Sequence, residues 1–420
     1  MANVVVLGAL DTKGREVEFL VRLIGARGHQ TLTIDTGVLG TSMFCADISR
    51  QEVAEAGGYS LDELIRQADR GAAVTAVSKG VVRLVEDLHA ARRVDAIVAM
   101  GGGAGTTVGT AAMRSLPLGI PKVMVSTLAS GDVRGFVGVK DIVMIPAIVD
   151  ISGLNRISRG VFTRAAGAVC GMLEDAPVAA ASSDAPLLTA SMFGNTTPCV
   201  ERARTVLEAQ GYELLVFHAT GSGGQTMESL IEAGQINGVL DVTTTEWADE
   251  VVGGVMSAGP HRLEAAARTG TPAVIAPGCL DMVNFWEPES LPAHLRGRRL
   301  YQHNAKQTLV RTTPEENVQL GEIIAGKLNS STGPVAVYLP LRGVSVISAE
   351  GKPFHWPEAD RALFDTLKSR LRPDIPCREM DCHINDAPFA EAMAQHLLAM
   401  CAASSPSTGS GLSRAGSRDS

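Results

Sequence analysis

Short apolar runs alternate along the chain with segments whose apolar residues recur at helical spacing. In the first third, Asn3–Ala9 predicts a buried strand, Arg15–Arg27 has the apolar spacing of a helix, and Gln30–Ile34 predicts a second strand. Two further apolar runs, Val94–Met100 and Ile120–Val125, follow the same pattern. Strands that are apolar on both faces and separated by helices form parallel sheets, so this pattern predicts a doubly wound α/β domain.

The second half of the chain repeats this order of elements. Leu187–Phe193 and Tyr212–Phe217 predict strands on either side of a helix at Val200–Gln210. The match in order and in strand-end residue types suggests duplication of one α/β unit, although all β-α-β sequences share part of this pattern. The sequence therefore predicts two Rossmann-like, doubly wound parallel-sheet domains that face each other across a cleft.

A stretch rich in alanine, proline and serine separates the two halves. Glu174–Pro186 has the composition of a linker, and the chain beyond Cys401 is rich in serine and glycine. We therefore predict an N-terminal nucleotide-binding domain over residues 1–178, a C-terminal domain over residues 187–401 and a disordered tail over residues 402–420.

Several connecting segments carry local signals of their own. Leu10–Gly14 is expected to be a loop, and Val38–Gly58 is expected to be irregular. Ser60, with Glu63 three residues later, has the pattern of a capping box that opens a helix. Gly333–Ile347 predicts two strands joined by a turn.

Three consecutive glycines end the strand Val94–Met100 and precede a segment of helical spacing, Val108–Leu116. Glycine lets the backbone approach a ligand closely, and a following helix directs its free N–H groups and positive dipole end toward the same space. The spacing is neither the dinucleotide fingerprint with a downstream acid nor a Walker loop. Gly101–Gly105 therefore predicts a phosphate-binding turn, and a turn without any ligand is the alternative interpretation.

Polar residues and glycines gather at the predicted carboxyl ends of the first-domain strands, where doubly wound sheets bind ligands. The predicted cofactor-binding residues form a set suited to a phosphate: Asp11, Thr12, Lys13, Asp35, Thr36, Gly101, Gly102, Gly103, Gly105, Thr106, Thr127, Ser130 and Gly131. Asp11, Asp35 and Asp132 could hold a magnesium ion through water, and Asp11 is the predicted metal residue. The alternative is that acidic and hydroxyl residues at these positions only cap helices.

The strand ends of the second domain carry more reactive residue types. His218, Glu246, Cys279 and His383 are the predicted catalytic residues, with the histidines as general acid or base and Cys279 as a nucleophile. A buried, inert Cys279 is the alternative. The histidines lack the spacing of known zinc motifs, and Ser222–Thr226 forms a second glycine turn.

Composition narrows the classes of function. The net charge of −8 and the pI near 5.7 argue against nucleic acid as an obligate partner, and 4% aromatic residues argue against base-stacking surfaces. The sequence has no signal-peptide pattern and no apolar run long enough to span a membrane. The seven scattered cysteines form no C-x-x-C pair, which favours a reducing compartment. We therefore expect a cytoplasmic protein that binds neither nucleic acid nor membrane.

The glycine turns and strand-end motifs together resemble one known family. These motifs are Gly8–Gly14, Gly101–Thr107, Thr127–Asp132, Gly221–Gln225, Pro277–Asn284 and His383–Asp386. From about Val4 to Leu398 the chain is similar to the uncharacterised protein family 0261, which includes the ATP-binding inhibitory domain of the tomato mosaic virus resistance protein and bacterial relatives. The resemblance implies two Rossmann-like subdomains, dimerisation, and ATP with Mg²⁺ held by the first subdomain. It implies no known reaction.

Two functions from different classes follow from the residues and the resemblance. In the first, an ATP-dependent enzyme acts on a small metabolite in the second domain or the cleft. Gly101–Gly105 would then contact the phosphates, Lys13 would neutralise their charge, Asp11 would assist Mg²⁺, and His218 or His383 would be the acid or base. In the second, a non-catalytic protein responds to ATP through dimerisation or domain closure. Either would form a homodimer or a higher homo-oligomer.

A metabolite-binding module of the periplasmic type is disfavoured, because an export signal is missing and aromatic residues are few.

Overall fold

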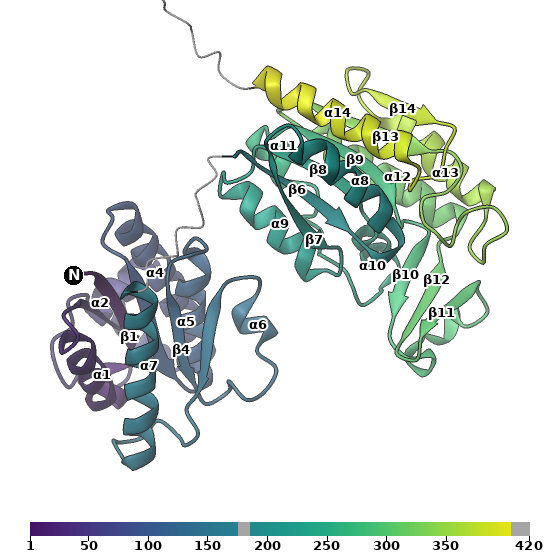
Figure 1. The fold of residues 1–420 in the computed structure, drawn as a ribbon. Coiled ribbons are helices and arrows are strands. Elements are labelled where there is room, and N and C mark those ends of the chain that lie inside the picture. The colour runs from purple at the N-terminus through teal and green to yellow at the C-terminus, as the bar shows by residue number, and fades with distance from the viewer. Residues whose placement is uncertain (175–184, 405–420) are drawn as a thin grey trace, which may run out of the picture. The chain divides into compact units, whose positions relative to one another are not determined.

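The computed structural model describes residues 1–174 and 185–404 of the chain. The chain divides into two compact units, residues 1–182 and 183–420, called here the N-terminal and C-terminal units (Figure 1). Most of the predicted linker and the predicted tail from residue 405 onward lie outside the described residues. Ala402–Ser404, which the sequence places in that tail, instead form the last residues of helix α14 (Ala387–Ser404).

The N-terminal unit is built on a five-stranded parallel sheet in the order β2-β1-β3-β4-β5. Its strands are β1 (Asn3–Gly8), β2 (Gln30–Asp35), β3 (Ala96–Gly101), β4 (Lys122–Ser126) and β5 (Ile142–Pro146). Strand β1 lies between β2 and β3, so that Val5 pairs with Leu32 on one side and with Ile97 on the other. This strand order is one of the common doubly wound arrangements.

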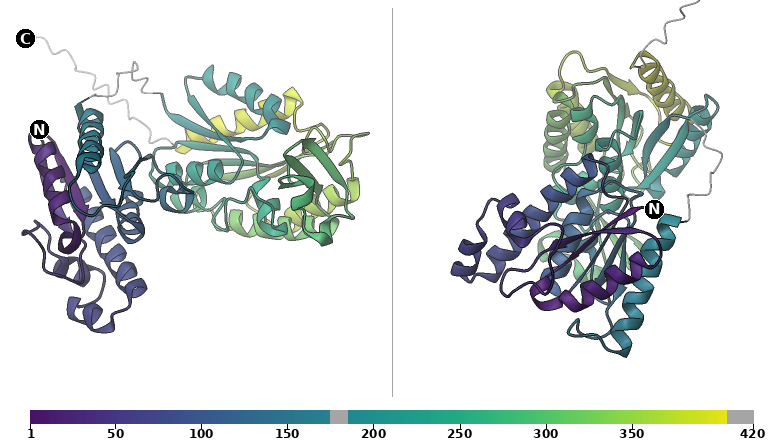
Figure 2. Two further views of the ribbon diagram at one scale, coloured as in Figure 1. Left: turned by 90° about the horizontal axis from the view of Figure 1, so that it is seen from below. Right: turned by 90° about the vertical axis from the view of Figure 1, so that its left-hand side faces the viewer.

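Helices cover both faces of this sheet (Figure 2). Val4 and Val6 pack in a cluster with α1 (Leu10–Gly25) and α7 (Arg156–Glu174), whereas Val5 packs on the opposite face. The helices of that opposite face are α2 (Arg50–Ala56), α4 (Arg70–Ala90) and α5 (Gly103–Ser115). Two shorter helices are α3 (Leu61–Gln67) and α6 (Arg134–Val137). Neighbouring side chains of a strand point to opposite faces, so burial on both faces explains the unbroken apolar runs in the sequence.

The C-terminal unit repeats this arrangement and extends it by one strand. Its six-stranded sheet has the order β14-β13-β9-β8-β6-β7, and all of its neighbouring strands are parallel. The strands are β6 (Leu187–Met192), β7 (Glu213–His218), β8 (Gly238–Thr243), β9 (Ala273–Gly278), β13 (Val335–Pro340) and β14 (Cys377–Met380). Its first five strands therefore lie in the same order as those of the N-terminal unit. The predicted fold class, α/β with two Rossmann-like parallel sheets, is confirmed.

Two hydrophobic clusters cover the two faces of the C-terminal sheet. On one face, α8 (Thr197–Glu208) and α14 bury Leu207 and Leu397 in the same cluster. The other face carries α9 (Ser222–Glu232), α10 (Glu246–Val252), α11 (Ala265–Thr269), α12 (Pro314–Asn329) and α13 (Pro357–Arg370). The unit also contains the short 3-10 helices η1 (Gly194–Thr196), η2 (Pro288–Ser290) and η3 (Ala293–Leu295).

A third, antiparallel sheet in the C-terminal unit is absent from the sequence-based prediction. It has the order β10-β12-β11, with β10 at Met282–Phe285, β12 at Gln307–Arg311 and β11 at Leu300–Asn304. Strand β11 is mostly polar and exposed, and a bulge between Gln302 and Asn304 interrupts its register. A short, polar edge strand gives little hydrophobic alternation, which explains why the pattern did not reveal β11, whereas β10 and β12 are mostly buried but only 4 and 5 residues long.

Helix α1 begins at Leu10, so the predicted loop at Leu10–Gly14 is wrong. The Asp35 carboxylate accepts a hydrogen bond from the backbone N–H of Leu10, at 3.0 Å. The helix then continues through Lys13, whose backbone is not helical (φ −129°, ψ 19°). The side chain that accepts a hydrogen bond from the first free N–H group of this helix is that of Asp35, at the end of strand β2. No sequence signal near Leu10 indicates this distant partner.

Two other connecting segments also differ from their predictions. Val38–Gly58, predicted to be irregular, contains helix α2, which begins with a capping box at Ser49. The capping box predicted at Ser60 is confirmed. Gly333–Ile347 contains one strand, β13, and not two. After β13, the Ser348 hydroxyl accepts hydrogen bonds from backbone N–H groups that a second strand would have paired.

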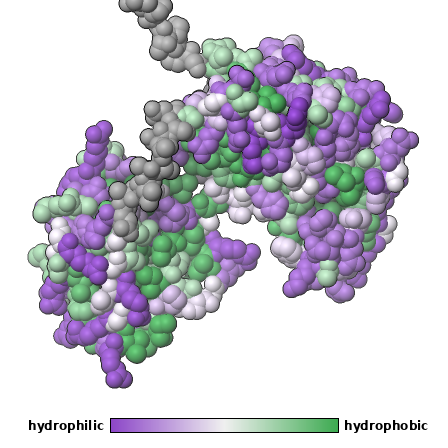
Figure 3. All heavy atoms as spheres, in the orientation of Figure 1, coloured by the Kyte–Doolittle hydropathy of each residue, from purple (hydrophilic) through white to green (hydrophobic). Residues whose placement is uncertain are grey.

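Polar residues cover much of both units in the face shown in Figure 3, and apolar residues are interspersed among them. The most exposed large apolar side chains include Leu39 and Ile148 of the N-terminal unit, which are 80% and 71% exposed. Among the described residues, no helix is both long enough and apolar enough to cross a membrane.

Candidate functional site

An open pocket of about 610 Å³ lies at the carboxyl ends of β1 and β3 in the N-terminal unit. These strands are neighbours, but α1 after β1 and α5 after β3 cover opposite faces of the sheet. Such a switch point leaves a crevice beyond the strand ends, which is where doubly wound folds bind ligands. Of the predicted cofactor-binding residues, the pocket is lined by Asp11, Thr12, Lys13, Thr36, Gly102, Gly103 and Gly105.

The start of helix α5 forms one wall of this pocket. The helix begins at Gly103, before the predicted start at Val108. Its N-cap residue, Gly102, has no side chain that could cap the helix. The first backbone hydrogen bond of the helix runs from Thr106 N–H to Gly102 O, which leaves the N–H groups of Gly103, Ala104 and Gly105 without an intrahelical acceptor. Free N–H groups and the positive end of the helix dipole favour an anion at this position.

Packing explains only some of these glycines. A Cβ at Gly101 would lie 2.6 Å from Gly105 Cα, so the close backbone approach requires glycine there. A Cβ at Gly103 would meet no atom within 4 Å, and one at Gly102 would meet only Thr127 Oγ1, at 3.6 Å. Glycine at an open helical position costs about 0.5–1 kcal/mol relative to alanine. The fold therefore does not account for the bare backbone at Gly103.

Asp11 and Lys13 lie beside this helix start. The Asp11 carboxylate accepts hydrogen bonds from the N–H groups of Leu39 and Gly40, at 2.9 and 3.1 Å. Burial raises the pKa of Asp11, but the hydrogen bonds from the loop outweigh burial and hold the pKa below its ordinary value. The Lys13 ammonium donates to Ile151 O at 2.7 Å, which uses one of its three hydrogens. A cation and an anion thus face the same pocket.

Other predicted cofactor residues hold the surrounding loops. Asp35 is buried, and its Oδ1 accepts hydrogen bonds from the N–H groups of Leu10 and Gly37 at 3.0 and 2.8 Å. Thr106 is buried, and its hydroxyl contacts Ser126 Oγ at 2.7 Å. The remaining predicted residues that do not line the pocket are Gly101, Thr127, Ser130 and Gly131.

The carboxylates considered for magnesium occupy different surroundings. Asp132 forms an exposed ion pair with Arg134, at 2.7 Å, and does not line the pocket. Asp150, which follows β5, does line it, but sequence reasoning missed this residue because it did not identify β5 as a strand. Among the described residues, no group of three or more His, Cys, Asp or Glu side chains could hold a metal ion. A bound Mg²⁺ would therefore depend on ligand phosphates and water, with Asp11 or Asp150 assisting.

The pocket also has an apolar wall and a second cation that the sequence did not single out. Val38, Leu64, Val74, Val77 and Val108 line it, together with Arg70 at the start of α4. Apolar residues from three helices and a loop meet here only in the folded unit. The capping box at Ser60 predicted the helix that carries Leu64, and Asp69, whose carboxylate accepts from the N–H groups of Gly71 and Ala72, is a further helix-capping signal that the sequence analysis did not use.

Glu246, a predicted catalytic residue, occupies the second glycine turn. It is buried, and its Oε1 accepts hydrogen bonds from the N–H groups of Gly221 and Gly224, at 2.7 and 3.1 Å. Its Oε2 accepts from Arg262 Nε at 2.7 Å. Burial raises the pKa of Glu246, and Arg262 opposes that effect. The positive start of α9 therefore already holds an anion that belongs to the protein.

Arg262 joins this carboxylate to the centre of the C-terminal sheet. Its guanidinium makes two hydrogen bonds to Asp241, at 2.6 and 2.7 Å, and one to Glu228, at 3.0 Å. Ser191 donates a further hydrogen bond to Asp241, at 2.6 Å. A buried cation bonded to three carboxylates is a structural network, because each of these carboxylates contacts the same guanidinium inside the protein.

The other predicted catalytic residues do not form a nucleophile–base pair. Cys279 is completely buried, burial raises the pKa of its thiol well above its ordinary value, and its backbone has a positive φ of 59°. His383 bonds Ser345 O through Nε2 at 2.8 Å, and its Nδ1 accepts from Asn385 N–H at 3.1 Å. His218 is exposed and stacks on Phe193, with ring centroids 5.3 Å apart. Within the described residues, no hydrogen bond joins these side chains to one another.

Comparison with known proteins gives the family. Two family models match nearly the whole chain: the N-terminal domain of uncharacterised protein family UPF0261 matches residues 2–177, and its C-terminal domain matches residues 185–401. A UPF0261 protein of Clostridium tetani is 50% identical over 400 residues, which are 95% of this chain and 98% of the relative. A UPF0261 protein of Rhizobium meliloti is 44% identical over 394 residues, with 93% of this chain and 97% of the relative covered.

A plant protein is also similar. The ToMV resistance protein Tm-1 of Solanum lycopersicum is 37% identical over 414 residues, which are 93% of this chain but only 55% of the tomato protein. The family models and these relatives agree over both units, and the chain belongs to the uncharacterised protein family UPF0261.

Proposed function

We propose that the N-terminal unit binds ATP together with Mg²⁺. The observation that carries this proposal is the bare backbone at the start of α5, where Gly103 faces a pocket of about 610 Å³ and has no packing reason to be glycine. Phosphate oxygens would accept hydrogen bonds from the free N–H groups of Gly103, Ala104 and Gly105.

The chemistry of the pocket walls supports a nucleotide over a bare anion. The end near Lys13 and Asp11 is polar and charged, whereas Val74, Val77 and Val108 supply an apolar wall. A nucleotide needs both surfaces, since its phosphates are anionic and its base is a flat, largely apolar ring. Lys13 would neutralise phosphate charge, and Asp11 or Asp150 would help to hold the Mg²⁺ that accompanies the phosphates.

The proposal includes two functional classes. In the first, ATP binding supports turnover of a small metabolite in the C-terminal unit; in the second, ATP acts as a non-catalytic effector of a homodimer. Glu246 and His383 make structural hydrogen bonds and Cys279 is buried, which argues against catalytic roles for these three residues. This favours the second class. Turnover of a small molecule elsewhere in the C-terminal unit would favour the first. A cytoplasmic location, expected from the sequence, belongs to the same proposal.

Calorimetric titration of ATP, with and without Mg²⁺, tests the proposal. Gly103→Val would place a side chain in the space for phosphate, and the Cβ atom of that side chain would meet nothing within 4 Å. Gly171→Val is the matched control. Gly171 lies in helix α7 of the same unit and does not line the pocket, and a Cβ added to it would also meet nothing within 4 Å.

We expect Mg²⁺-dependent binding to the wild type, a loss of affinity of at least about tenfold in Gly103→Val, and a change of less than about twofold in Gly171→Val. No heat at millimolar ATP, or equal binding by wild type and Gly103→Val, would overturn the proposal.

A further inference from the structure

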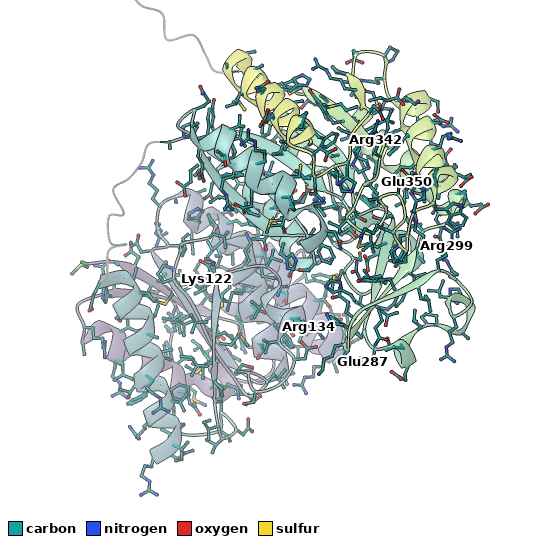
Figure 4. The ribbon with its side chains drawn as sticks, turned by 45° about the vertical axis from the view of Figure 1, so that its right-hand side comes forward. Lys122, Arg134, Glu287, Arg299, Arg342 and Glu350 are labelled. Atoms are coloured by element: carbon teal, nitrogen blue, oxygen red, sulfur yellow. The ribbon has the colours of Figure 1, made fainter. Side chains whose placement is uncertain are left out.

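The C-terminal unit contains a second pocket, of about 540 Å³, at the carboxyl ends of β13 and β14. It lies between α13 and the chain that follows β13, and Figure 4 labels two of its lining residues, Arg342 and Glu350. The carboxyl ends of parallel strands are where doubly wound sheets bind ligands. This pocket shares no lining residue with the proposed nucleotide site, so a ligand here would bind whether or not the N-terminal unit binds ATP.

Most charges that line this pocket are paired within the protein. Arg342 makes a forked ion pair with Asp381, at 2.8 and 2.7 Å. Lys368 bonds Glu379, at 2.7 Å, and also lies 3.0 Å from Asp365. The remaining acid of α13 in the pocket, Asp360, accepts a hydrogen bond at 2.6 Å from Arg311, which is buried.

Two opposite charges in the same pocket are left over. Arg361 on α13 and Glu350 on the facing loop both line the pocket and are exposed. Across the described part of the chain, neither side chain has an ion pair or a hydrogen bond, and they do not pair with each other. A guanidinium presents a planar fork that suits a carboxylate, and a carboxylate suits an ammonium group.

Two further side chains of the pocket would orient a small ligand. Phe364 is 5% exposed and supplies part of an apolar wall. His355 Nδ1 lies 3.3 Å from Ser348 O. Because a carbonyl can only accept, Nδ1 carries a hydrogen, and among the described residues Nε2 has no hydrogen-bond partner. Small-molecule sites typically combine an apolar wall with a few convergent polar groups of this kind.

We propose that this pocket binds a small zwitterion of the amino-acid class, whose carboxylate contacts Arg361 and whose ammonium group contacts Glu350. A simple dicarboxylate would place its second negative charge against Glu350, and a diamine would place a positive charge against Arg361. Because like charges repel, the two unpaired side chains select a ligand that carries both signs. His355 would accept or donate a hydrogen bond to the ligand.

A thermal-shift screen of the full chain with each standard L-amino acid, at about 10 mM, tests this assignment, followed by calorimetric titration of the best ligand. The variants Arg361→Gln and Glu350→Gln remove one charge each. Arg370→Gln and Glu358→Gln are matched controls, because both residues are exposed on α13 and neither lines the pocket.

We expect at least one amino acid to bind, and Arg361→Gln and Glu350→Gln each to lower its affinity at least about tenfold. The two controls should stay within about twofold of the wild type, and analogues of the ligand that lack the amine or the carboxylate should bind at least about tenfold more weakly. The assignment is overturned if no amino acid stabilises the protein, if binding is unchanged in Arg361→Gln, or if an analogue with a single charge binds equally well. ATP titration of the same variants keeps this outcome separate from that of the nucleotide proposal.

Discussion

The carboxylate of Glu246 lies 2.7 Å from the backbone nitrogen of Gly221 and fills the glycine turn at the start of α9. The glycine turn of the N-terminal unit has no such internal anion among the described residues, although both turns begin helices at the carboxyl edge of a parallel sheet. Two turns that resemble each other in sequence therefore differ in their surroundings. One is closed by the protein's own carboxylate, and the other is open to a ligand.

Replacing Glu246 with glutamine should destabilise the C-terminal unit. The change removes one of the three carboxylates that surround Arg262 and takes away the acceptor of its Nε–H group, and a buried donor without an acceptor costs about 1–3 kcal/mol. Chemical unfolding of the full chain should show the loss. Glu232→Gln is the control, because its ion pair with Arg268 is about half-exposed and such pairs contribute about 0–1 kcal/mol. A stable Glu246→Gln protein with altered turnover of a metabolite would instead support the predicted catalytic role.

Lys13→Met should weaken MgATP binding by at least about tenfold and should flatten the dependence of affinity on salt, because one ligand-facing cation is lost. The wild-type lysine also holds Ile151 O, so circular dichroism must first show an intact fold. Lys79→Met is the control, since Lys79 is exposed on α4 of the same unit and does not line the pocket. Equal losses in both variants would point to bulk charge and not to a contact with phosphate.

Stability of the C-terminal unit should fall as the pH rises from about 4 to about 7. Burial raises the pKa of Asp249 to about 7 and that of Asp281 to about 6, both from an ordinary value of 3.8. A carboxyl that binds its proton more tightly when folded stabilises the fold fully below the unfolded pKa. This contribution is lost as the pH rises through the folded pKa.

Asp249→Asn tests this pH dependence, because its amide oxygen can still accept from the N–H groups of Met256 and Asn284. The variant should show a flatter profile of unfolding midpoint between about pH 4 and pH 7. Asp62→Asn, an exposed change on α3, should leave the slope unchanged. A wild-type midpoint that rises over this range would contradict the prediction.

Iodoacetamide should modify Cys45 and leave Cys279 unmodified in the folded protein. Cys45 is exposed, whereas Cys279 is fully buried and the pKa of its thiol is raised, so little thiolate is available. Peptide mass spectrometry before and after denaturation distinguishes the two sites. Rapid labelling of Cys279 in the native state would restore the hypothesis that it is a nucleophile.

Local pattern was sufficient where one segment carries its own signal. The apolar run Val94–Met100 could be identified as a strand because both of its faces are buried, and Ser60 could be identified as a helix cap because its partner is three residues away. The position of Gly102 and Gly103 in a pocket also followed from sequence, since the carboxyl ends of parallel strands share one edge of the sheet.

Side-chain roles depended on contacts between distant parts of the chain. Asp35 and Asp11 look alike in the sequence, yet Asp35 is buried under the start of α1 while Asp11 lines the pocket. Glu246 was identified as reactive because it follows a strand, but its partners Gly221 and Arg262 lie in other loops. Arg361 and Glu350 gave no signal, because an unpaired charge is recognisable only when its neighbours are known.

The sequence by itself determined the two α/β units, their parallel sheets and the open glycine turn after β3, because these depend on periodicity and on the conformational freedom of glycine. Only the tertiary structure decided which charged groups are paired inside the protein and which face a pocket. Pairing is set by distances of a few ångströms between residues far apart along the chain, and burial then determines whether a charge is satisfied by the protein, by water or by a ligand.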